Sequence, residues 1–412
     1  MEITKKIPEK LNLVAISIIS FLPLIFILGS GILNLFIIIL DLIFIFEVVS
    51  KKKLKYFNNK FFYSLILFWL ILLINLIFSI SFVDSLPRSF GFVRFIFFAL
   101  AINYYFNESS KYTNHIFAIW AIIFFIISFD LIFEYIFGFN TLGFKSYMPG
   151  RLSGFFNQEL KIGHLYSAII LICLSFIHIF LSQQKNQNKF INYKIKNSIF
   201  YLLFILFLFI SLVIGERSNF IKTLLMTIPF LFLFNKKDFG KKLMSILITI
   251  AILFTIMFKN EKFEDRFWKM FFKPLMNNPI ELVSNSSYGS HYKVALEVFN
   301  NNMITGVGLK NYRKEVVKDG YSSNASIHPH QIHFEILSET GLLGYFSFLI
   351  FFIFNITLAI NYFIKEKNIF QLSGTLFVIV SLMPILPSGS FFTSFGAALF
   401  WLNFGLMLPK QR

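Results

Sequence analysis

Cysteine and charge are both scarce in this sequence. Cys173 is the single cysteine among 412 residues and lies in an apolar stretch, which excludes a disulfide framework and a cluster of thiolate metal ligands. Only 14% of the residues are charged, against roughly 25% in soluble proteins, and 60 residues are phenylalanine. Charge-free runs such as 61–82 and 201–215 approach the ~20 residues that a helix needs to cross a membrane. The composition predicts an all-α polytopic membrane protein.

Several sequence motifs are also missing. The chain has no HExxH motif, no GxSxG-like serine site and no glycine-rich phosphate loop. These absences disfavour an intramembrane protease and a nucleotide site. The net charge of +17 does not predict a nucleic-acid partner, because the basic residues lie between hydrophobic runs and not on one soluble face. We therefore expect no nucleic-acid binding.

The hydrophobic runs predict about twelve transmembrane helices. They are expected at 11–29, 32–49, 61–82, 89–106, 115–138, 162–182, 197–215, 218–234, 242–258, 342–364, 371–387 and 392–409. One long polar interval interrupts them between spans 9 and 10. We expect spans 1–9 within residues 1–258, a loop domain of short helices over 259–341 that ends in a catalytic helix, and spans 10–12 within 342–412.

The short loops predict the orientation of the chain. One set of loops carries 21 Lys and Arg residues. The opposite set carries only five, which are Arg88, Lys145, Arg151, Lys161 and Arg217. Cytoplasmic loops are enriched in Lys and Arg, so both termini are expected in the cytoplasm and residues 259–341 outside it. The outer set is richer in Arg, whose planar fork binds phosphate through two parallel hydrogen bonds.

Two arginines at the outer ends of spans are candidates for substrate binding. Arg217, in IGERSNFIK, follows a charge-free span, where a charge usually pairs or faces a substrate. The alternative is an interfacial side chain balanced by Glu216. Arg151 lies in PGRLSGFFNQELKIGH, whose amide and carboxylate groups suit sugar hydroxyls. This loop is otherwise an ordinary capping or re-entrant loop.

Two other arginines are less easily interpreted. Arg94 lies inside a span, where a buried Arg needs a partner, and Asp130 or Glu134 of the fifth span is the expected one. Arg313 follows GVGLKN between basic neighbours. It belongs either to a substrate site or to a solvated basic face.

The stretch HPHQIHFEILSETGLLGY gathers three of the seven histidines, His328, His330 and His333. Their spacing matches no zinc motif, so we expect no metal. A helix that starts after Pro329 would place His330 and His333 on one stripe at the membrane surface. A histidine with an ordinary pKa of ~6.5 can take a proton from a hydroxyl there. The alternative is that these histidines only cap an interfacial helix.

The same stretch resembles the signature of the O-antigen ligase and polymerase superfamily. His330-Gln331 is followed after nine residues by Gly341-Leu342-Leu343-Gly344. GERSNF is similar to the family's short Ser-Arg hairpin, and RLSGFFNQELKIG to its Arg-x-Ser-Gly-x-Phe loop. The resemblance implies a GT-C-like, inverting, metal-independent glycosyltransferase without a cofactor. His330 would be the general base, and Arg217 would bind the donor diphosphate.

The resemblance also implies substrates and a location. The donor would be a glycan on undecaprenyl diphosphate, and the acceptor a hydroxyl of another glycan or of lipid A-core. The reaction would take place among membrane lipids, at the periplasmic face of a bacterial inner membrane. The motif does not separate polymerase from ligase. The main alternative class is a transporter or flippase of lipid-linked glycans, which the large outer loop and the lack of an internal repeat disfavour.

One family feature is missing from the sequence. The family often has another catalytic arginine, in a segment resembling Arg-x-x-x-Trp before an Ala-Leu pair. Here SHYKVAL has no arginine, and His291 stands near that place. Arg313 is the substitute we expect. Arg151, Arg94, His291 and Gln331 complete the expected substrate-binding residues.

Overall fold

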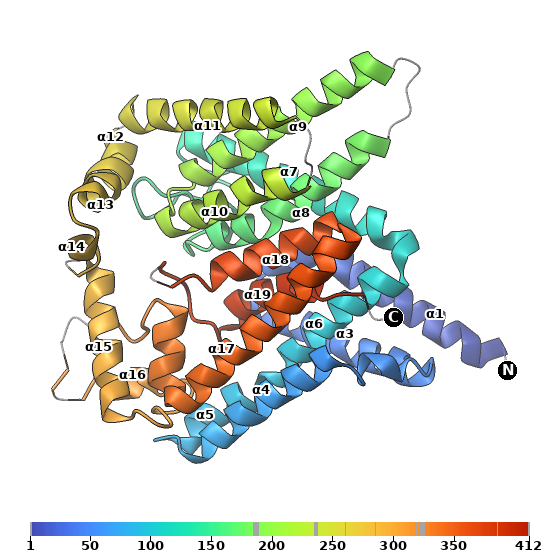
Figure 1. Cartoon of the computed structure of the whole chain (residues 1–412), viewed down its shortest axis with the longest axis vertical. Coiled ribbons are helices and arrows are strands. Elements are labelled where there is room, and N and C mark those ends of the chain that lie inside the picture. The colour runs from blue at the N-terminus through green and yellow to red at the C-terminus, as the bar shows by residue number, and fades with distance from the viewer. Residues whose placement is uncertain are drawn as a thin grey trace.

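A computed structural model describes residues 2–183, 189–234, 238–259, 261–284, 286–318, 320–321, 326–384 and 386–410. All regular structure in these ranges is helical, as Figure 1 shows. Eight candidate membrane spans were found among the described residues. They are Ser30–Ser50, Lys60–Ile77, Phe82–Glu108, Lys111–Phe137, Ile162–Gln183, Ile195–Val213, Arg217–Phe234 and Ile332–Glu366. The polytopic helical class predicted from the composition is confirmed.

Twelve full-length spans are not confirmed. The first expected span is divided into α1 (Glu2–Ser20) and α2 (Leu22–Ile27), with Pro23 at the start of α2. The last two expected spans appear as the shorter apolar helices α18 (Ile369–Ser381) and α19 (Ser394–Met407). α18 ends before two prolines, Pro384 and Pro387, because proline cannot continue a helix and restricts the residue before it.

The remaining helices follow in chain order. They are α3 (Ser30–Ser50), α4 (Lys60–Ile77), α5 (Phe82–Gly91), α6 (Val93–Glu108), α7 (Ser110–Phe137), α8 (Ile162–Gln183), α9 (Lys189–Val213), α10 (Arg217–Phe234) and α11 (Phe239–Lys259). The long polar interval then contains short helices. These are α12 (Glu261–Phe263), the π-helical segment η3 (Glu264–Phe272), α13 (Lys273–Asn277), α14 (Pro279–Ser284), α15 (Ser287–Asn301) and α16 (Tyr312–Glu315). Figure 1 shows this segment along one side of the bundle, between α11 and α17 (Ile332–Glu366).

Two clusters of buried apolar side chains stabilise the described chain. The larger cluster runs through the bundle, where α19 packs against α18 and α6. The smaller one contains Val294, Ala295, Val298, Val307, Tyr312 and Val316. It joins α15 and α16 to the loop between them, and α15 also packs against α17. The start of α17 is thereby fixed against the short helices that precede it.

α17 begins two residues after His330. The expectation of a catalytic helix that contains His330 is therefore wrong. Its first residue is Ile332, and the side-chain oxygen of Gln331 caps it by accepting hydrogen bonds from the backbone N–H groups of His333 (2.6 Å) and Phe334 (3.2 Å). His330 has a φ of 57°, so it is left-handed and outside the helix. It therefore shares no helical stripe with His333.

α17 is also interrupted, at Gly341, where φ is 62° and ψ is −165°. A Cβ at Gly341 would lie 2.5 Å from the backbone carbon of Ile304, so no other residue fits without displacing the loop. The N–H groups of Leu342 and Leu343 donate to the carbonyls of Met303 (2.8 Å) and Ile304 (3.1 Å). The spacing of the signature therefore has a structural meaning: one end caps α17, and the other breaks it.

Candidate functional site

Three arginines from separate segments meet at the start of α10. Arg217 Nη1 donates to the backbone carbonyl of Arg266 at 3.4 Å, and Arg266 Nη2 donates to the carbonyl of Gly215 at 3.0 Å. Arg151 Nη2 lies 2.6 Å from Glu216 Oε1 in an ion pair. All three arginine side chains are half-buried. We call Arg151, Arg217 and Arg266 the arginine cluster.

A close contact between two loops forms this cluster. Gly215 has a φ of +77°, and a Cβ there would lie 2.0 Å from the carbonyl oxygen of Gly150. The backbone N–H of Leu152 donates to the carbonyl of Ile214 at 3.0 Å beside this contact. A side chain at Gly215 would push the loops apart, since it would clash with backbone. The glycine therefore lets Arg151 reach Glu216.

The arginine cluster has an excess of positive charge. Burial lowers the pKa of Arg266, and the neighbouring Arg217 and Arg151 lower this pKa further, while Glu216 opposes them. Like charges in a partly buried site repel one another, and a bound anion relieves this repulsion. Two guanidinium groups beside each other suit a diphosphate, because each can donate parallel hydrogen bonds to phosphate oxygens.

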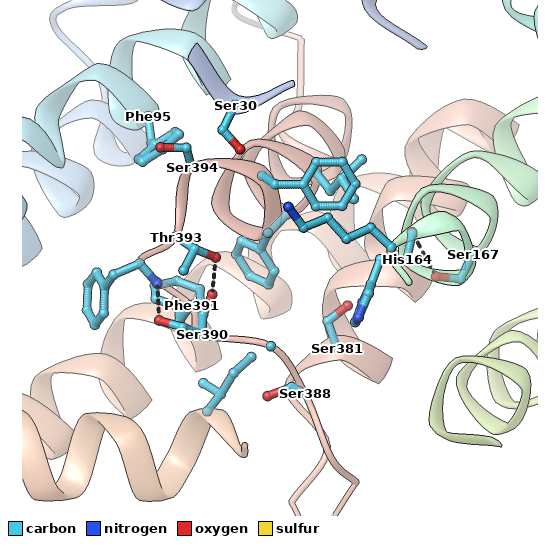
Figure 2. Close-up of a pocket in the computed structure, with 18 of the residues that line it drawn as sticks. Ser30, Phe95, His164, Ser167, Ser381, Ser388, Ser390, Phe391, Thr393 and Ser394 are labelled. Atoms are coloured by element: carbon cyan, nitrogen blue, oxygen red, sulfur yellow. Dashed lines mark hydrogen bonds between the residues drawn. The ribbon is translucent and has the colours of Figure 1, made fainter. Parts of the chain in front are cut away.

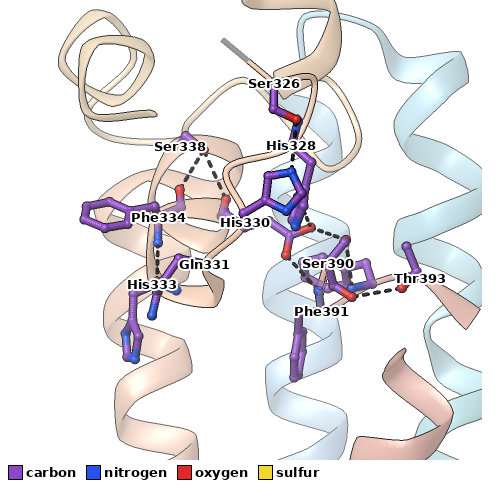
Figure 3. A network of polar contacts seen from close by, with 12 residues as sticks. Ser326, His328, His330, Gln331, His333, Phe334, Ser338, Ser390, Phe391 and Thr393 are labelled. Carbon is purple, nitrogen blue, oxygen red and sulfur yellow. Dashed lines mark hydrogen bonds and ion pairs between the residues drawn. The ribbon is translucent and has the colours of Figure 1, made fainter. Parts of the chain in front are cut away.

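The histidines form a second cluster, at the loop before α17. The ring of His330 lies 5.3 Å from that of His291 and 4.9 Å from that of His328, measured between centroids. Ser326 Oγ lies 3.2 Å from His330 Nε2, and the Ser326 N–H donates to His291 Nδ1 at 3.2 Å. Figure 3 shows Ser326, His328 and His330 gathered beside the start of α17. We call His291, His328 and His330 the histidine cluster.

The histidine cluster is neutral at physiological pH. Burial lowers the pKa of His330 to about 4, and His328 and His291 contribute to the shift. Burial also lowers the pKa of His328 to about 4, although its Nδ1 lies 3.9 Å from Glu335 Oε1. A neutral imidazole has a free lone pair, so His330 can accept a proton from a nearby hydroxyl.

Tyr288, on α15, connects the two clusters. Its ring centroid lies 6.0 Å from that of His330 and 6.4 Å from that of His291. The same side chain is close enough to Arg217 and Arg266 to interact with their charges. A substrate near Tyr288 would therefore be close both to guanidinium groups and to neutral imidazoles.

The structure places the other expected residues outside the arginine cluster. Arg313 is exposed on α16, and its charge acts on His328. Gln331 is buried; besides capping α17, its side-chain nitrogen donates to the carbonyl of Met383 at 3.4 Å. Their roles in substrate binding stay predictions.

The expected pairing of Arg94 with Asp130 or Glu134 is wrong. Its charge interacts with Asp41 of α3, and its Nη1 donates to the carbonyl of Gly91 at 2.9 Å. Glu134 instead accepts hydrogen bonds from the backbone N–H groups of Ser153 (3.0 Å) and Gly154 (2.7 Å). Asp130 accepts from Thr141. Both carboxylates hold the loop after α7, because its turn leaves backbone N–H groups without helical partners.

Arg266 and Tyr288 were missed by reasoning from the sequence. The interval 259–341 contains only two arginines, Arg266 and Arg313, so only these two are candidates for the further catalytic arginine of the family. Nothing in EDRFWKM shows that a π-helical segment returns Arg266 to the loop before α10. In the described ranges, no group of three or more His, Cys, Asp or Glu side chains has the arrangement of a metal site.

The fold and these clusters define a multi-pass helical membrane protein with a basic site beside a histidine site. A family model described as O-Antigen ligase matches residues 200–349. The match supports the resemblance to the O-antigen ligase and polymerase superfamily that the signature indicated. The matched segment includes Arg217, Arg266, Tyr288, His291 and His330. A search of curated proteins found no match.

Proposed function

We propose that this protein transfers a glycan from undecaprenyl diphosphate to an acceptor hydroxyl, with His330 as the general base. The observation that carries the proposal is that Tyr288 contacts the rings of His291 and His330 and also interacts with the charges of Arg217 and Arg266. The O-antigen ligase match supports a ligase or polymerase of lipid-linked glycans. The acceptor is another glycan or lipid A-core.

The reaction needs a stabilised leaving group and a base. The acceptor oxygen forms a bond to the sugar C1 while the bond from C1 to the diphosphate oxygen breaks, so the configuration at C1 inverts. Arg217 and Arg266 stabilise the negative charge that develops on the diphosphate. His330 takes the proton of the attacking hydroxyl and releases it to water after transfer. The diphosphate is already a good leaving group, so no cofactor or metal is needed.

The proposed reaction takes place at the outer face of a bacterial inner membrane. Residues 259–341 are assigned to this outer side because the excess of Lys and Arg lies in the loops at the other end of the spans, which are expected in the cytoplasm. These residues form the outer domain of the proposed enzyme. The polyprenyl chain of the donor lies along the apolar helices, among membrane lipids.

The test replaces the proposed base. In His330→Ala, purified protein supplied with lipid-linked glycan and acceptor should lose about two to four orders of magnitude in rate. Donor binding should persist, because the arginine cluster is unchanged. His115→Ala, which removes an exposed histidine on α7, is the matched control and should keep the wild-type rate.

Three outcomes would contradict the proposal. Full activity of His330→Ala would exclude His330 as the base. Loss of wild-type activity in EDTA, with recovery on added zinc, would replace the base by a metal site. Movement of lipid-linked glycan across a vesicle membrane without consumption of the donor would indicate a transporter.

A further inference from the structure

A second basic site lies beside the histidine cluster and contains none of the residues proposed above to bind donor. It is a cavity of about 580 Å³ lined by five cationic side chains: Arg88, Arg94, Lys161, Lys222 and Lys310. No Asp or Glu is among its described lining residues. The lining also includes seven serine and threonine residues and seven phenylalanines, and several of them are labelled in Figure 2.

Carboxylates outside the lining offset some of these charges. The charges of Glu335 and Glu339 interact with that of Arg88, and the charge of Asp41 interacts with that of Arg94. Glu159 forms an ion pair of 2.6 Å with Lys161. Lys222 is less well compensated. It is only 9% exposed, and its Nζ donates to the carbonyl of Pro387 at 2.9 Å. Its charge interacts with Glu216, but that carboxylate already accepts hydrogen bonds from Arg151 and Asn219.

Two buried polar atoms of the lining also lack a hydrogen-bond partner. They are Arg94 Nε and Ser388 Oγ. A buried ammonium group and unpaired polar atoms are unfavourable in a low-dielectric interior, and an anion with several oxygens would compensate them together. The cavity is therefore suited to an anionic ligand that carries hydrogen-bonding groups.

The cavity adjoins the proposed base through one short segment. The backbone N–H of Ser388 donates to the carbonyl of His330 at 2.7 Å, and Ser388 also lines the cavity. Ser390, another lining residue, donates a hydrogen bond to Glu335 at the start of α17. A molecule in the cavity would thus rest on the segment that holds the His330 loop.

We propose that this cavity binds a negatively charged sugar of the acceptor glycan, one that carries a carboxylate or a phosphate. The inference rests on the proposed function. The volume is within the roughly 300–1,000 Å³ of small-molecule sites. Hydroxyl groups suit a sugar, phenylalanines suit its apolar faces, and the cations suit its charge. A polyprenyl chain does not fit this lining, because five charged groups are unfavourable next to hydrocarbon.

The kinetic test compares two acceptor oligosaccharides that differ only in a hexuronic acid or the corresponding neutral hexose. For the wild type, KM should be at least ten-fold lower with the acidic acceptor. In Lys222→Met, this preference should disappear, while kcat and the donor KM stay unchanged. Lys222→Arg should keep the preference. Lys111→Met, which removes an exposed lysine at the start of α7, should behave as the wild type. A phosphorylated hexose in the same position tests phosphate against carboxylate.

A binding measurement without turnover separates the two proposals. The hexuronic acid oligosaccharide should bind detergent-solubilised wild-type protein at least ten-fold more tightly than Lys222→Met, with equal melting temperatures. If it binds but the wild type transfers no glycan, the proposed function fails and the cavity assignment stands. Equal KM values for acidic, phosphorylated and neutral acceptors would overturn the assignment. Loss of binding of a short polyprenyl diphosphate in Lys222→Met, with oligosaccharide binding unchanged, would also overturn it.

Discussion

Acid should inhibit the proposed base much less than it inhibits an ordinary histidine. Burial lowers the pKa of His330 to about 4, so its proton is lost at lower pH than the usual ~6.5. At pH 5.5, about 97% of a group with a pKa near 4 is neutral, compared with about 9% of a group at ~6.5. Only the neutral form accepts the proton of the acceptor.

The assay is the initial rate of glycan transfer, measured as kcat/KM for the donor between pH 4 and 8. Between pH 7.5 and 5.5 we expect a fall of only a few per cent, where an ordinary histidine base would cause a fall of about ten-fold. The donor diphosphate is esterified at both ends, so its charge is constant over this range. The acceptor for this assay should be the neutral one, to exclude ionisation of a sugar carboxylate.

Stability must be followed in the same experiment, because the lowered pKa values also affect folding. His328 and His330 stay neutral in the fold, but they bind protons in the unfolded chain below pH ~6.5. The unfolded state then binds more protons, so stability falls as the pH decreases from about 6.5 towards 4. A ten-fold fall in kcat/KM by pH 5.5, with the protein still folded, would refute the assignment of a buried neutral base.

Two other predictions concern the arginines and the topology. Arg266→Lys and Arg217→Lys should each raise the donor KM or lower the rate by at least ten-fold, because lysine cannot make the paired hydrogen bonds of a guanidinium. The control is Lys269→Ala, at an exposed position of the same π-helical segment as Arg266. Wild-type kinetics of Arg266→Lys would show that Arg266 does not belong to the donor site. A reporter enzyme that works only outside the cytoplasm should be active when fused after Asn300 and inactive when fused after Lys53, and the reverse pattern would place His330 in the cytoplasm.

The sequence predicted those parts of the site that depend on local patterns. Charge-free runs located most helices, and the signature located His330, Gln331 and Gly341. Arg266 was not predictable, because its approach to Gly215 depends on how η3 returns to the bundle, and no local pattern encodes that contact. The same limit explains Arg94, whose charge interacts with Asp41 on another helix and not with the fifth span. The start of α17 was misplaced because its cap is the side chain of Gln331, which a search for apolar periodicity does not detect.

The interruption of α17 at Gly341 has a consequence for how the protein is assembled. On one side of the break, the carbonyls of Ser338 and Glu339 accept hydrogen bonds from Val307 (3.1 Å) and Gly308 (2.8 Å). On the other side, Leu342 and Leu343 donate to Met303 and Ile304. Unpaired backbone groups are strongly unfavourable in lipid. α17 therefore gains these four hydrogen bonds only when residues 303–308 have docked, so we expect the completion of this helix and the folding of the segment before it to be coupled.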